Sequence, residues 1–194
     1  MTLGVNEIVV HATITTPVGL LDVAATERGI SHVRFVVTGS GEPEDAGERH
    51  APSSAEEQAA RAHLAHGVRE LGAYFDGELK DFSVPLDYNF PSSFRGRAQA
   101  ALTRIPYGAT CTYKDLAAAA ESPKAVRAAG GACAHNPLPI FIPCHRVLPS
   151  TGGYGFYIGG PEAKRWLVEW EKNHPSPHSS GGEPQLSFRQ SNQP

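Results

Sequence analysis

The hydrophobic pattern of the chain changes its period at Pro91. Before this residue, apolar side chains alternate with polar ones over short stretches, which is typical of β-strands. After it, small and apolar residues recur every three or four positions, as on the faces of short helices. We therefore predict an α+β fold, in which a small N-terminal α/β domain with a short antiparallel sheet (residues 1–90) precedes a mainly helical C-terminal domain (residues 91–172). The composition of residues 173–194 predicts a disordered tail.

The first 90 residues predict a hairpin, a third strand and one long helix. A turn at residues 16–19 joins two alternating segments, and a third strand follows over residues 30–37. Residues 38–54 are dominated by Gly, Pro, Glu and Asp, which predicts a mobile acidic loop. Apolar residues at helical spacing predict a helix over residues 55–75, and residues 84–89 predict one more short strand.

Three short helices are predicted in the C-terminal domain. The first is capped by Ser92 or Ser93 and the second by Thr112. Pro123 is tolerated at the first helical position and is expected to start the third helix, which ends between residues 130 and 133. Two short helices joined by a tight turn form a helix-turn-helix, although an ordinary helical hairpin is the more common outcome of this pattern alone.

Charge is unevenly distributed along the 194 residues. The net charge is −3, but residues 1–90 carry 14 acidic against 6 basic side chains, and residues 91–172 carry 5 against 10. This asymmetry suggests that the C-terminal domain meets an anion, while scattered solvated charges remain an equally open interpretation. The pI near 6.3 argues against a protein that coats nucleic acid without selectivity.

The composition indicates a globular protein of the cytoplasm. Hydrophobic residues make up 40% of the chain, which is enough for a core. No stretch approaches the roughly 20 apolar residues of a membrane helix, and the N-terminus lacks the pattern of a signal peptide, so we expect no membrane partner. The three cysteines do not suggest a disulfide framework; they are Cys111, Cys133 and Cys144.

Cys144 lies between a short apolar run, residues 140–142, and the pair His145 and Arg146. A cysteine at the end of a buried segment is usually an inert core residue, but a base or a cation beside a thiol lowers its pKa and creates a nucleophile. Neighbouring residues of a strand point to opposite faces, so contact between Cys144 and His145 needs a turn or a bridging water. A carboxylate would then hold the imidazole in one tautomer, and the candidates are Glu162, Glu169 and Glu171.

Several spaced segments resemble the O6-alkylguanine-DNA alkyltransferases, also called methylated-DNA–protein-cysteine methyltransferases. The string Pro143-Cys144-His145-Arg146-Val147 is similar to the signature of that family. The resemblance covers nearly the whole chain except the acidic loop and the tail. Its other segments are residues 16–19, 74–79, Ile105-Pro106-Tyr107-Gly108, Thr112-Tyr113, 123–130, Asn136-Pro137, Tyr157, Gly159-Gly160, Lys164 and Glu171.

This resemblance implies a chemistry and a set of catalytic residues. The family moves an alkyl group irreversibly from the oxygen of a damaged guanine to a cysteine, once per protein molecule, without a metal or a cofactor. Cys144 would be the acceptor, His145 would take the thiol proton through a water, and Glu171 would orient His145. Asn136 would brace the active-site segment, and Tyr113 would donate a hydrogen bond to the departing guanine, whose ring gains negative charge.

The resemblance also implies a partner, double-stranded DNA that carries O6-alkylguanine and is bound through its minor groove by a monomer. The damaged nucleotide must leave the base stack to reach the thiol, and Arg127 would fill the gap, whereas a surface salt bridge is the commoner role for such an arginine. The expected DNA contacts are Tyr113, Ala125, Arg127, Ala128, Gly130 and Arg146. The expected lining of the guanine pocket is Pro143, Gly155, Tyr157, Ile158 and Gly159.

Three features depart from the family pattern. Gln99 stands where the family has a core tryptophan, which predicts altered packing. Ile158 stands where many members have a small or hydroxyl residue, which predicts an altered preference for the alkyl group. Residues 95–97 place a glycine between two arginines early in the same helix as Gln99.

Two other functions stay open from the sequence. A lesion-binding protein that only marks alkylguanine would lack the acceptor cysteine, which is present here as Cys144. A cysteine hydrolase would need a histidine placed for direct proton transfer, and it would turn over many times. We expect no metal site, because residues 1–90 contain no cysteine and their only closely spaced histidines are His63 and His66.

Overall fold

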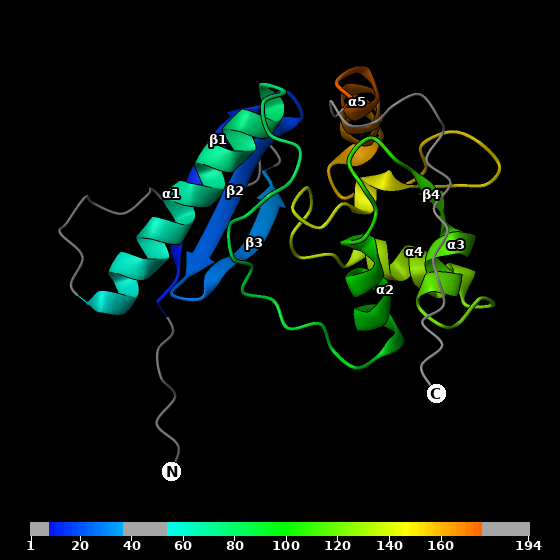
Figure 1. Cartoon of the computed structure of the whole chain (residues 1–194), viewed down its shortest axis with the longest axis horizontal. Helices are drawn as coiled ribbons and strands as arrows, with labels where there is room; N and C mark the ends of the chain where they lie inside the picture. The colour runs from blue at the N-terminus through cyan, green and yellow to red at the C-terminus, as the bar shows by residue number, and fades with distance from the viewer. Residues whose placement is uncertain (1–7, 37–53, 176–194) are drawn as a thin grey trace, which may run out of the picture. The chain divides into compact units, whose positions relative to one another are not determined.

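The computed structural model of this protein describes residues 8–36 and 54–175. Figure 1 shows the helices and strands, with colours that follow the chain from the N-terminus to the C-terminus. The acidic loop expected over residues 38–54 lies outside the described residues apart from Ser54, and so does the expected tail from residue 176 onward. Within the described part of the chain, no helix is both long enough and apolar enough to cross a membrane.

The chain divides into two compact units. The first comprises residues 1–89 and 137–141, and the second comprises residues 90–136 and 142–194. Segment 137–141, which the sequence places in the C-terminal domain, therefore groups with the first unit. The first unit holds a sheet and a long helix, whereas the second is mainly helical, so the predicted α+β class is confirmed.

A three-stranded antiparallel sheet in the order β1-β2-β3 forms the base of the first unit. Its strands are β1 (Val10–Thr16), β2 (Gly19–Thr26) and β3 (Gly29–Phe35). Thr16 pairs with Gly19, so the predicted hairpin closes through a two-residue turn, and Gly19 directly after this turn has a positive φ of 114° that glycine tolerates. Both the hairpin and the third strand are confirmed. The buried apolar side chains that alternate along β2 are Leu21, Val23 and Ala25.

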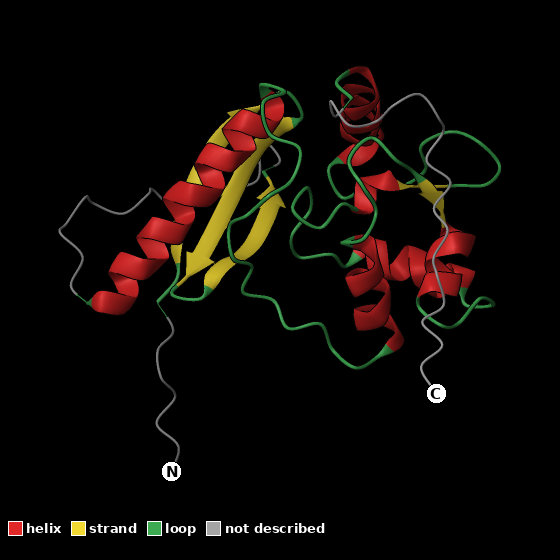
Figure 2. Cartoon of the chain, viewed as in Figure 1, coloured by secondary structure: helices red, strands yellow, loops and turns green. Residues whose placement is uncertain are grey.

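Helix α1 (Ala55–Phe75) has the bounds predicted from the sequence. Ser54 caps it by accepting a hydrogen bond from the backbone N–H of Glu57. The helix packs along one face of the sheet (Figure 2) and contacts β1, β2 and β3. Its buried face supplies the core of this unit with Ala60, Leu64, Leu71 and Tyr74.

Residues 84–89 do not form the predicted strand. Ile30 makes an isolated bridge with Leu86, and its backbone N–H donates to the carbonyl of Pro85 at 2.8 Å. Proline has no N–H to continue a ladder, so pairing stops after one bridge. The preceding turn is held by the buried carboxylate of Glu70, which accepts from the hydroxyl of Ser83 at 2.6 Å and from the backbone N–H of Val84 at 3.0 Å.

Segment 137–141 is anchored in the first unit at both of its ends. The carbonyl of Pro137 accepts a hydrogen bond from the backbone N–H of Val33 at 2.9 Å. The ring of Phe141 lies 4.6 Å from the ring of Phe82, centroid to centroid. Between them Ile140 is buried at a positive φ of 78°, a conformation that a β-branched residue holds only when its surroundings fix it.

Helices α2 (Phe94–Leu102), α3 (Tyr113–Ala119) and α4 (Val126–Ala134) form the body of the second unit. Ser93 caps α2, and Thr112 caps α3 through a capping box with Asp115, as predicted. The third helix starts later than predicted. The backbone N–H of Ala125 donates to the carbonyl of Ser122 at 2.8 Å, so the proline between them lies in a turn before the helix.

Gln99 lies on α2 and is fully buried against the end of α4. Its side-chain amide donates to the carbonyls of Ala132 and His135 at 3.1 and 3.0 Å. These carbonyls belong to the C-terminal turn of α4, which has no later N–H of its own to bind them. The amide thus ties α2 to the end of α4 immediately before Asn136.

Helix α5 (Gly160–Asn173) was not predicted from the sequence. Its start carries the expected signal, because Pro161 lies in the first turn. Its buried face has no continuous apolar stripe, since two of its four buried residues, Lys164 and Glu171, are charged. The other two are Ala163 and Leu167. A parallel pair of two-residue strands, β4 (Cys111–Thr112) and β5 (Val147–Leu148), completes the unit.

Candidate active site

Cys144 begins a single 3-10 turn, η1 (Cys144–Arg146), and is 2% exposed. Its backbone N–H donates to the carbonyl of Ile142 at 2.8 Å. Because the segment turns here instead of continuing as a strand, the side chains of successive residues do not alternate between two faces. The segment therefore has the turn that the sequence analysis required for contact between Cys144 and His145.

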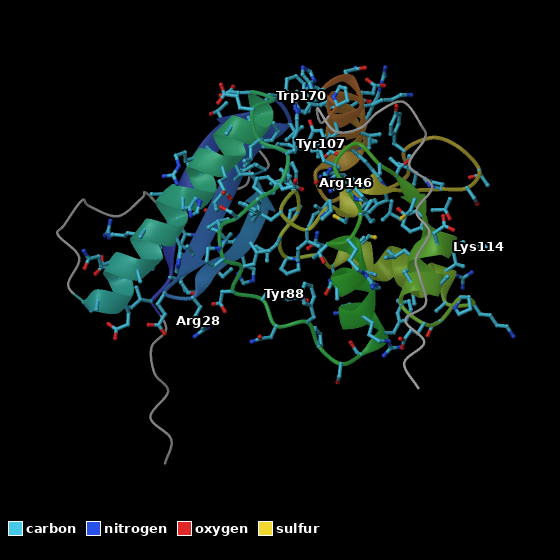
Figure 3. All side chains as sticks on the ribbon, viewed as in Figure 1. Arg28, Tyr88, Tyr107, Lys114, Arg146 and Trp170 are labelled. Atoms are coloured by element: carbon cyan, nitrogen blue, oxygen red, sulfur yellow. The ribbon has the colours of Figure 1, made fainter. Side chains whose placement is uncertain are left out.

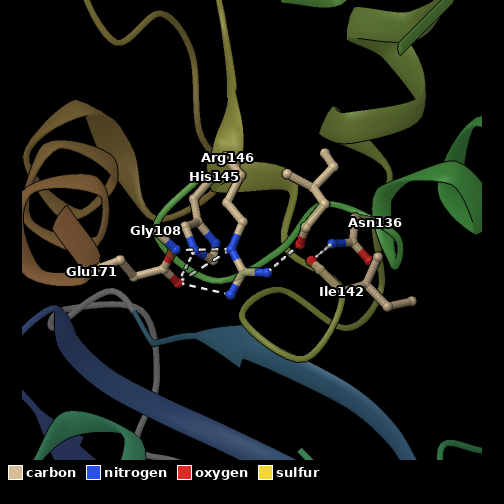
Figure 4. A network of polar contacts seen from close by, with 7 residues as sticks. Gly108, Asn136, Ile142, His145, Arg146 and Glu171 are labelled. Atoms are coloured by element: carbon tan, nitrogen blue, oxygen red, sulfur yellow. Dashed lines mark hydrogen bonds and ion pairs between the residues drawn. The ribbon is translucent and has the colours of Figure 1, made fainter. Parts of the chain in front are cut away.

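The side-chain amide of Asn136 binds the cysteine segment at two points. Its Nδ2 donates to Sγ of Cys144 at 3.1 Å and to the carbonyl of Ile142 at 2.7 Å. Figure 4 shows the second of these contacts. Asn136 itself is 2% exposed, so water does not compete for its amide. The amide therefore fixes the direction of the thiol and supplies a donor to its sulfur.

Burial raises the pKa of the Cys144 thiol to about 11, although the Asn136 hydrogen bond and the positive charge of Lys164 act in the opposite direction. At neutral pH the sulfur therefore carries its proton. This corrects the expectation that the adjacent His145 and Arg146 lower the thiol pKa. The nucleophile needs a base at the moment of reaction.

His145 is fully buried and has the properties of such a base. Its Nε2 lies 2.9 Å from a carboxylate oxygen of Glu171. A carboxylate only accepts hydrogen bonds, so Nε2 carries the proton and Nδ1 keeps the lone pair. Nδ1 is buried and has no hydrogen-bond partner within the described residues. Burial lowers the pKa of His145 despite the opposing charge of Glu171, which favours the neutral imidazole at neutral pH.

Of the three carboxylates considered from the sequence, Glu171 is the one at the site. Glu169 is bound instead by Tyr154 and Arg165, and Glu162 is exposed at the start of α5. Besides His145, Glu171 accepts from Arg146 Nη2 at 2.9 Å and from the backbone N–H of Gly108 at 3.0 Å (Figure 4). Burial disfavours its charge, but His145 and Arg146 hold the pKa of Glu171 far below its ordinary range.

Arg146 does not have the DNA contact expected from the sequence. Its side chain is buried and its guanidinium binds Glu171 and the carbonyl of Ile105. The guanidinium also lies 5.7 Å from the centre of the half-buried Tyr107 ring, and Figure 3 labels both side chains. A buried guanidinium committed to an internal carboxylate cannot reach a phosphate or a base, so this prediction is wrong.

Lys164 was not assigned a role from the sequence, yet it lies within the site. The side chain is 1% exposed, and its Nζ donates to the carbonyl of Val147 at 2.7 Å and contacts the hydroxyl of Tyr113 at 3.4 Å. Burial raises the pKa of Tyr113 to about 12, so its phenol stays protonated and can donate a hydrogen bond. The only signal for Lys164 in the sequence was its place in the resemblance.

The loop before α5 brings further expected residues to this region. Tyr157 is buried, and its ring lies perpendicular to the imidazole of His145 at 6.4 Å. Gly155 has a positive φ of 70°, and a Cβ there would lie 2.9 Å from the ring of Pro149 and 3.8 Å from the Tyr113 hydroxyl. Of the remaining expected pocket residues, Ile158 is 43% exposed, Gly159 precedes α5 and Pro143 precedes η1. Phe156, in the same loop, is 73% exposed.

The first turns of α4 carry most of the residues expected to contact DNA. Arg127 and Ala128 are exposed, and Ala125 and Gly130 are half-buried. None of the hydrogen bonds or ion pairs described for the second unit engages the Arg127 side chain, in contrast to Arg146. This part of α4 therefore presents a basic residue among small ones at the surface.

Possible metal ligands do not gather in the described residues. No group of three His, Cys, Asp or Glu side chains with suitable geometry occurs there. His63 contacts the carbonyl of Thr26, while His66 contacts Glu70, so the two closely spaced histidines have separate partners.

Two family models match most of the chain. Residues 9–88 match the ribonuclease-like domain of 6-O-methylguanine DNA methyltransferase, and residues 93–173 match its DNA-binding domain. A methylated-DNA–protein-cysteine methyltransferase of Mycolicibacterium paratuberculosis is 37% identical over 164 residues, which covers 84% of this chain and 93% of the relative. The chain belongs to the methylated-DNA–protein-cysteine methyltransferase family.

Solved structures of this methyltransferase family superpose on the chain. The crystal structure of Mycobacterium tuberculosis O6-methylguanine methyltransferase has a TM-score of 0.70 and 34% identity, and covers 88% of this chain and 96% of that protein. The Mycobacterium tuberculosis OGT protein crystallised in complex with DNA has a TM-score of 0.68 and 35% identity, and covers 84% and 93%. The family resemblance noted in the sequence is thereby confirmed.

Proposed function

We propose that this protein repairs DNA by transferring the alkyl group of O6-alkylguanine to Sγ of Cys144, which restores guanine. Family membership supports alkyl transfer to a cysteine as the reaction. The observation that carries the choice of acceptor is the arrangement around one thiol. Cys144 is held by Asn136, and the residue after it, His145, is a buried imidazole whose Nε2 is fixed by Glu171.

The reaction is a single displacement at the alkyl carbon. The lone-pair nitrogen Nδ1 of His145 takes the thiol proton, through a water where one bridges the two groups. The sulfur forms a bond to carbon while the bond from carbon to O6 breaks, and its electron pair passes to the guanine ring. Guanine regains a proton from solvent as His145 releases one, so protons balance. The thioether product has no good leaving group, and each molecule therefore reacts once.

Tyr113 and Lys164 stabilise the departing guanine in this proposal. The ring gains negative charge as the bond to carbon breaks, and a protonated phenol can donate a hydrogen bond to it. Lys164 contacts the phenol oxygen, and its positive charge favours donation by the phenol. The neighbouring loop with Gly155 and Tyr157 supplies a close backbone approach and an aromatic wall for the base.

We further propose that the second unit binds the DNA, with α4 in the minor groove. The lesion must leave the base stack before its carbon can meet a buried sulfur. The exposed Arg127 fills the gap, and small residues beside it allow a close approach to the groove. The site is assembled from one chain, which supports a monomer. The described cysteines are all free, and a thiol acceptor needs a reducing compartment, which supports the cytoplasm.

Mass spectrometry after mixing with a duplex that carries one O6-methylguanine tests the proposal. We expect the gain of one methyl mass on the peptide that contains Cys144, saturating at one per molecule. Cys144→Ser should abolish the gain, whereas Cys111→Ser, which removes another buried thiol, should keep it. Continued turnover would indicate a hydrolase, and binding without methyl gain would indicate a lesion-binding protein. Either result would overturn the proposal.

A further inference from the structure

The carboxylate of Glu171 is shared between a histidine and an arginine that are neighbours in the sequence. One oxygen, Oε1, contacts Nε2 of His145 and Nη2 of Arg146, both at 2.9 Å. The other oxygen, Oε2, accepts from Nε of Arg146 at 2.9 Å and from the backbone N–H of Gly108 at 3.0 Å. Arg146 therefore spans both oxygens, while His145 meets one of them.

This sharing has an electrostatic consequence for the base. A buried carboxylate beside an imidazole favours the imidazolium form, which cannot accept a proton. The positive charge of Arg146 acts on the same carboxylate and offsets part of its effect. The other titratable groups around His145 are Lys164, Tyr157 and Cys144. The positive charge of Lys164 also disfavours a charge on the imidazole, whereas the Tyr157 phenol and the Cys144 thiol are uncharged.

Arg146 is held in a fixed orientation by contacts other than Glu171. Its Nη1 donates to the carbonyl of Ile105, and the Tyr107 ring faces the guanidinium at 5.7 Å. The turn that supplies these two groups also supplies the Gly108 N–H to Glu171. A planar guanidinium can bind a carboxylate through two nitrogens and a carbonyl through the third, whereas an ammonium acts as a single point charge.

We propose that Arg146 is a positioning residue that keeps His145 neutral, and therefore able to accept the Cys144 proton, by binding both oxygens of Glu171. The inference rests on the proposed function. It assigns to Arg146 a part in the reaction in place of the DNA contact expected from the sequence. The effect on the reaction passes through Glu171 and His145, because Arg146 has no contact with the thiol among those described.

The test is the rate of methyl transfer to Cys144 as a function of pH, measured on a duplex with one O6-methylguanine. The rate falls at low pH as His145 is protonated. In Arg146→Gln the full charge of Glu171 acts on His145, so the midpoint of this fall should rise by about one pH unit, which makes the rate about tenfold lower at pH values below the midpoint. The rate should recover at higher pH.

Arg146→Lys guards against loss of folding in the first variant. Its single ammonium occupies less of the carboxylate, so the midpoint should rise by a smaller amount, while thermal unfolding reports on its stability. Arg165→Gln is the matched control, because it removes a positive charge from α5 whose partner is Glu169. The control should leave the midpoint unchanged.

An unchanged midpoint in a folded Arg146 variant would overturn the inference, whatever its effect on the overall rate, since a merely structural role lowers the rate at every pH alike. Failure of the proposed function gives a different result. In that case the unmodified protein itself gains no methyl group on Cys144.

Discussion

Each unit of this protein contains a buried glutamate in contact with a histidine. In the first unit Glu70 contacts His66 at 3.1 Å, and in the second Glu171 contacts His145 at 2.9 Å. The histidines differ in burial, since the side chain of His66 is 32% exposed and that of His145 is 0% exposed. A contact between a glutamate and a histidine therefore does not show by itself whether the histidine is structural or reactive.

The other partners of the two carboxylates explain the difference. Glu70 accepts from backbone N–H groups of the turn at Ser83 and Val84, so its charge holds a loop in place. Glu171 instead binds two side chains, those of His145 and Arg146. His145 keeps an unprotonated ring nitrogen and directly follows the buried Cys144 in the chain. A histidine becomes a useful base here because burial removes water from its ring and the carboxylate fixes its tautomer.

Replacing each histidine is expected to give the largest contrast. His145→Ala should slow methyl transfer by about 10²–10⁴-fold, because the buried thiol loses the base that takes its proton. His66→Ala should leave the transfer rate unchanged. Single-turnover assays with a methylated duplex measure both. Equal slowing in the two variants would contradict the assignment of the base to His145.

Glu70→Gln should cost about 1–3 kcal/mol of unfolding free energy at pH 7, since an amide turns a donor toward backbone N–H groups that need an acceptor. Burial opposes the charge of Glu70, yet hydrogen bonds from Ser83 and Val84 keep its pKa below the ordinary value of 4.5. Its carboxylate therefore stabilises the fold above about pH 4.5, and this contribution is lost as the pH falls through the lowered pKa.

Urea unfolding at pH 7 and at pH 3.5 tests this linkage. The difference between the unmodified protein and Glu70→Gln should shrink at the lower pH. A difference that stays constant would mean that Glu70 acts through its shape and not through its charge. Methyl transfer at pH 7 should be unaffected by this variant, in contrast to every change at the Glu171 pair.

The smallest effect is expected for a substitution in the loop before α5, where a buried side chain is followed by an exposed one. Tyr157 is buried, whereas Ile158 beside it is 43% exposed. We expect an isoleucine at the pocket to favour a large apolar group, and burial of part of its surface is worth about 1 kcal/mol. Ile158→Ser should therefore lower the rate with O6-benzylguanine about fivefold relative to O6-methylguanine, in a competition assay.

Val9→Ser, which changes an exposed apolar residue of the first unit, should change neither rate. Equal loss on both lesions would exclude a role in selectivity.

Local signals in the sequence predicted most of the elements. The two-residue turn before Gly19, the Ser93 cap and the Thr112 cap each depend on residues within a few positions of one another. The misplaced start of α4 is of another kind, because Pro123 suits both a turn and a first helical position. A hydrogen bond between Ser122 and Ala125 decides between them.

The residues of the site could be identified from the sequence because they lie in recognisable motifs. Their burial and protonation states could not be predicted in the same way. The pKa of Cys144 is raised by burial, which depends on the packing of distant segments. The role of Arg146 depends on Glu171, which lies 25 residues later, on a helix whose buried face includes charged residues. No short-range pattern connects such a pair, so the arginine was expected at the surface.

Segment 137–141 makes the first unit discontinuous, since the chain leaves this unit after Asn89, returns at Pro137 and leaves again after Phe141. The two units therefore cannot be separated by one cut. A fragment that begins at residue 90 would keep the buried side chains of Leu138 and Ile140 without the sheet and helix of their unit. Lost activity in such a fragment would report missing support for the segment between Asn136 and Cys144, and would not show that the first unit takes part in catalysis.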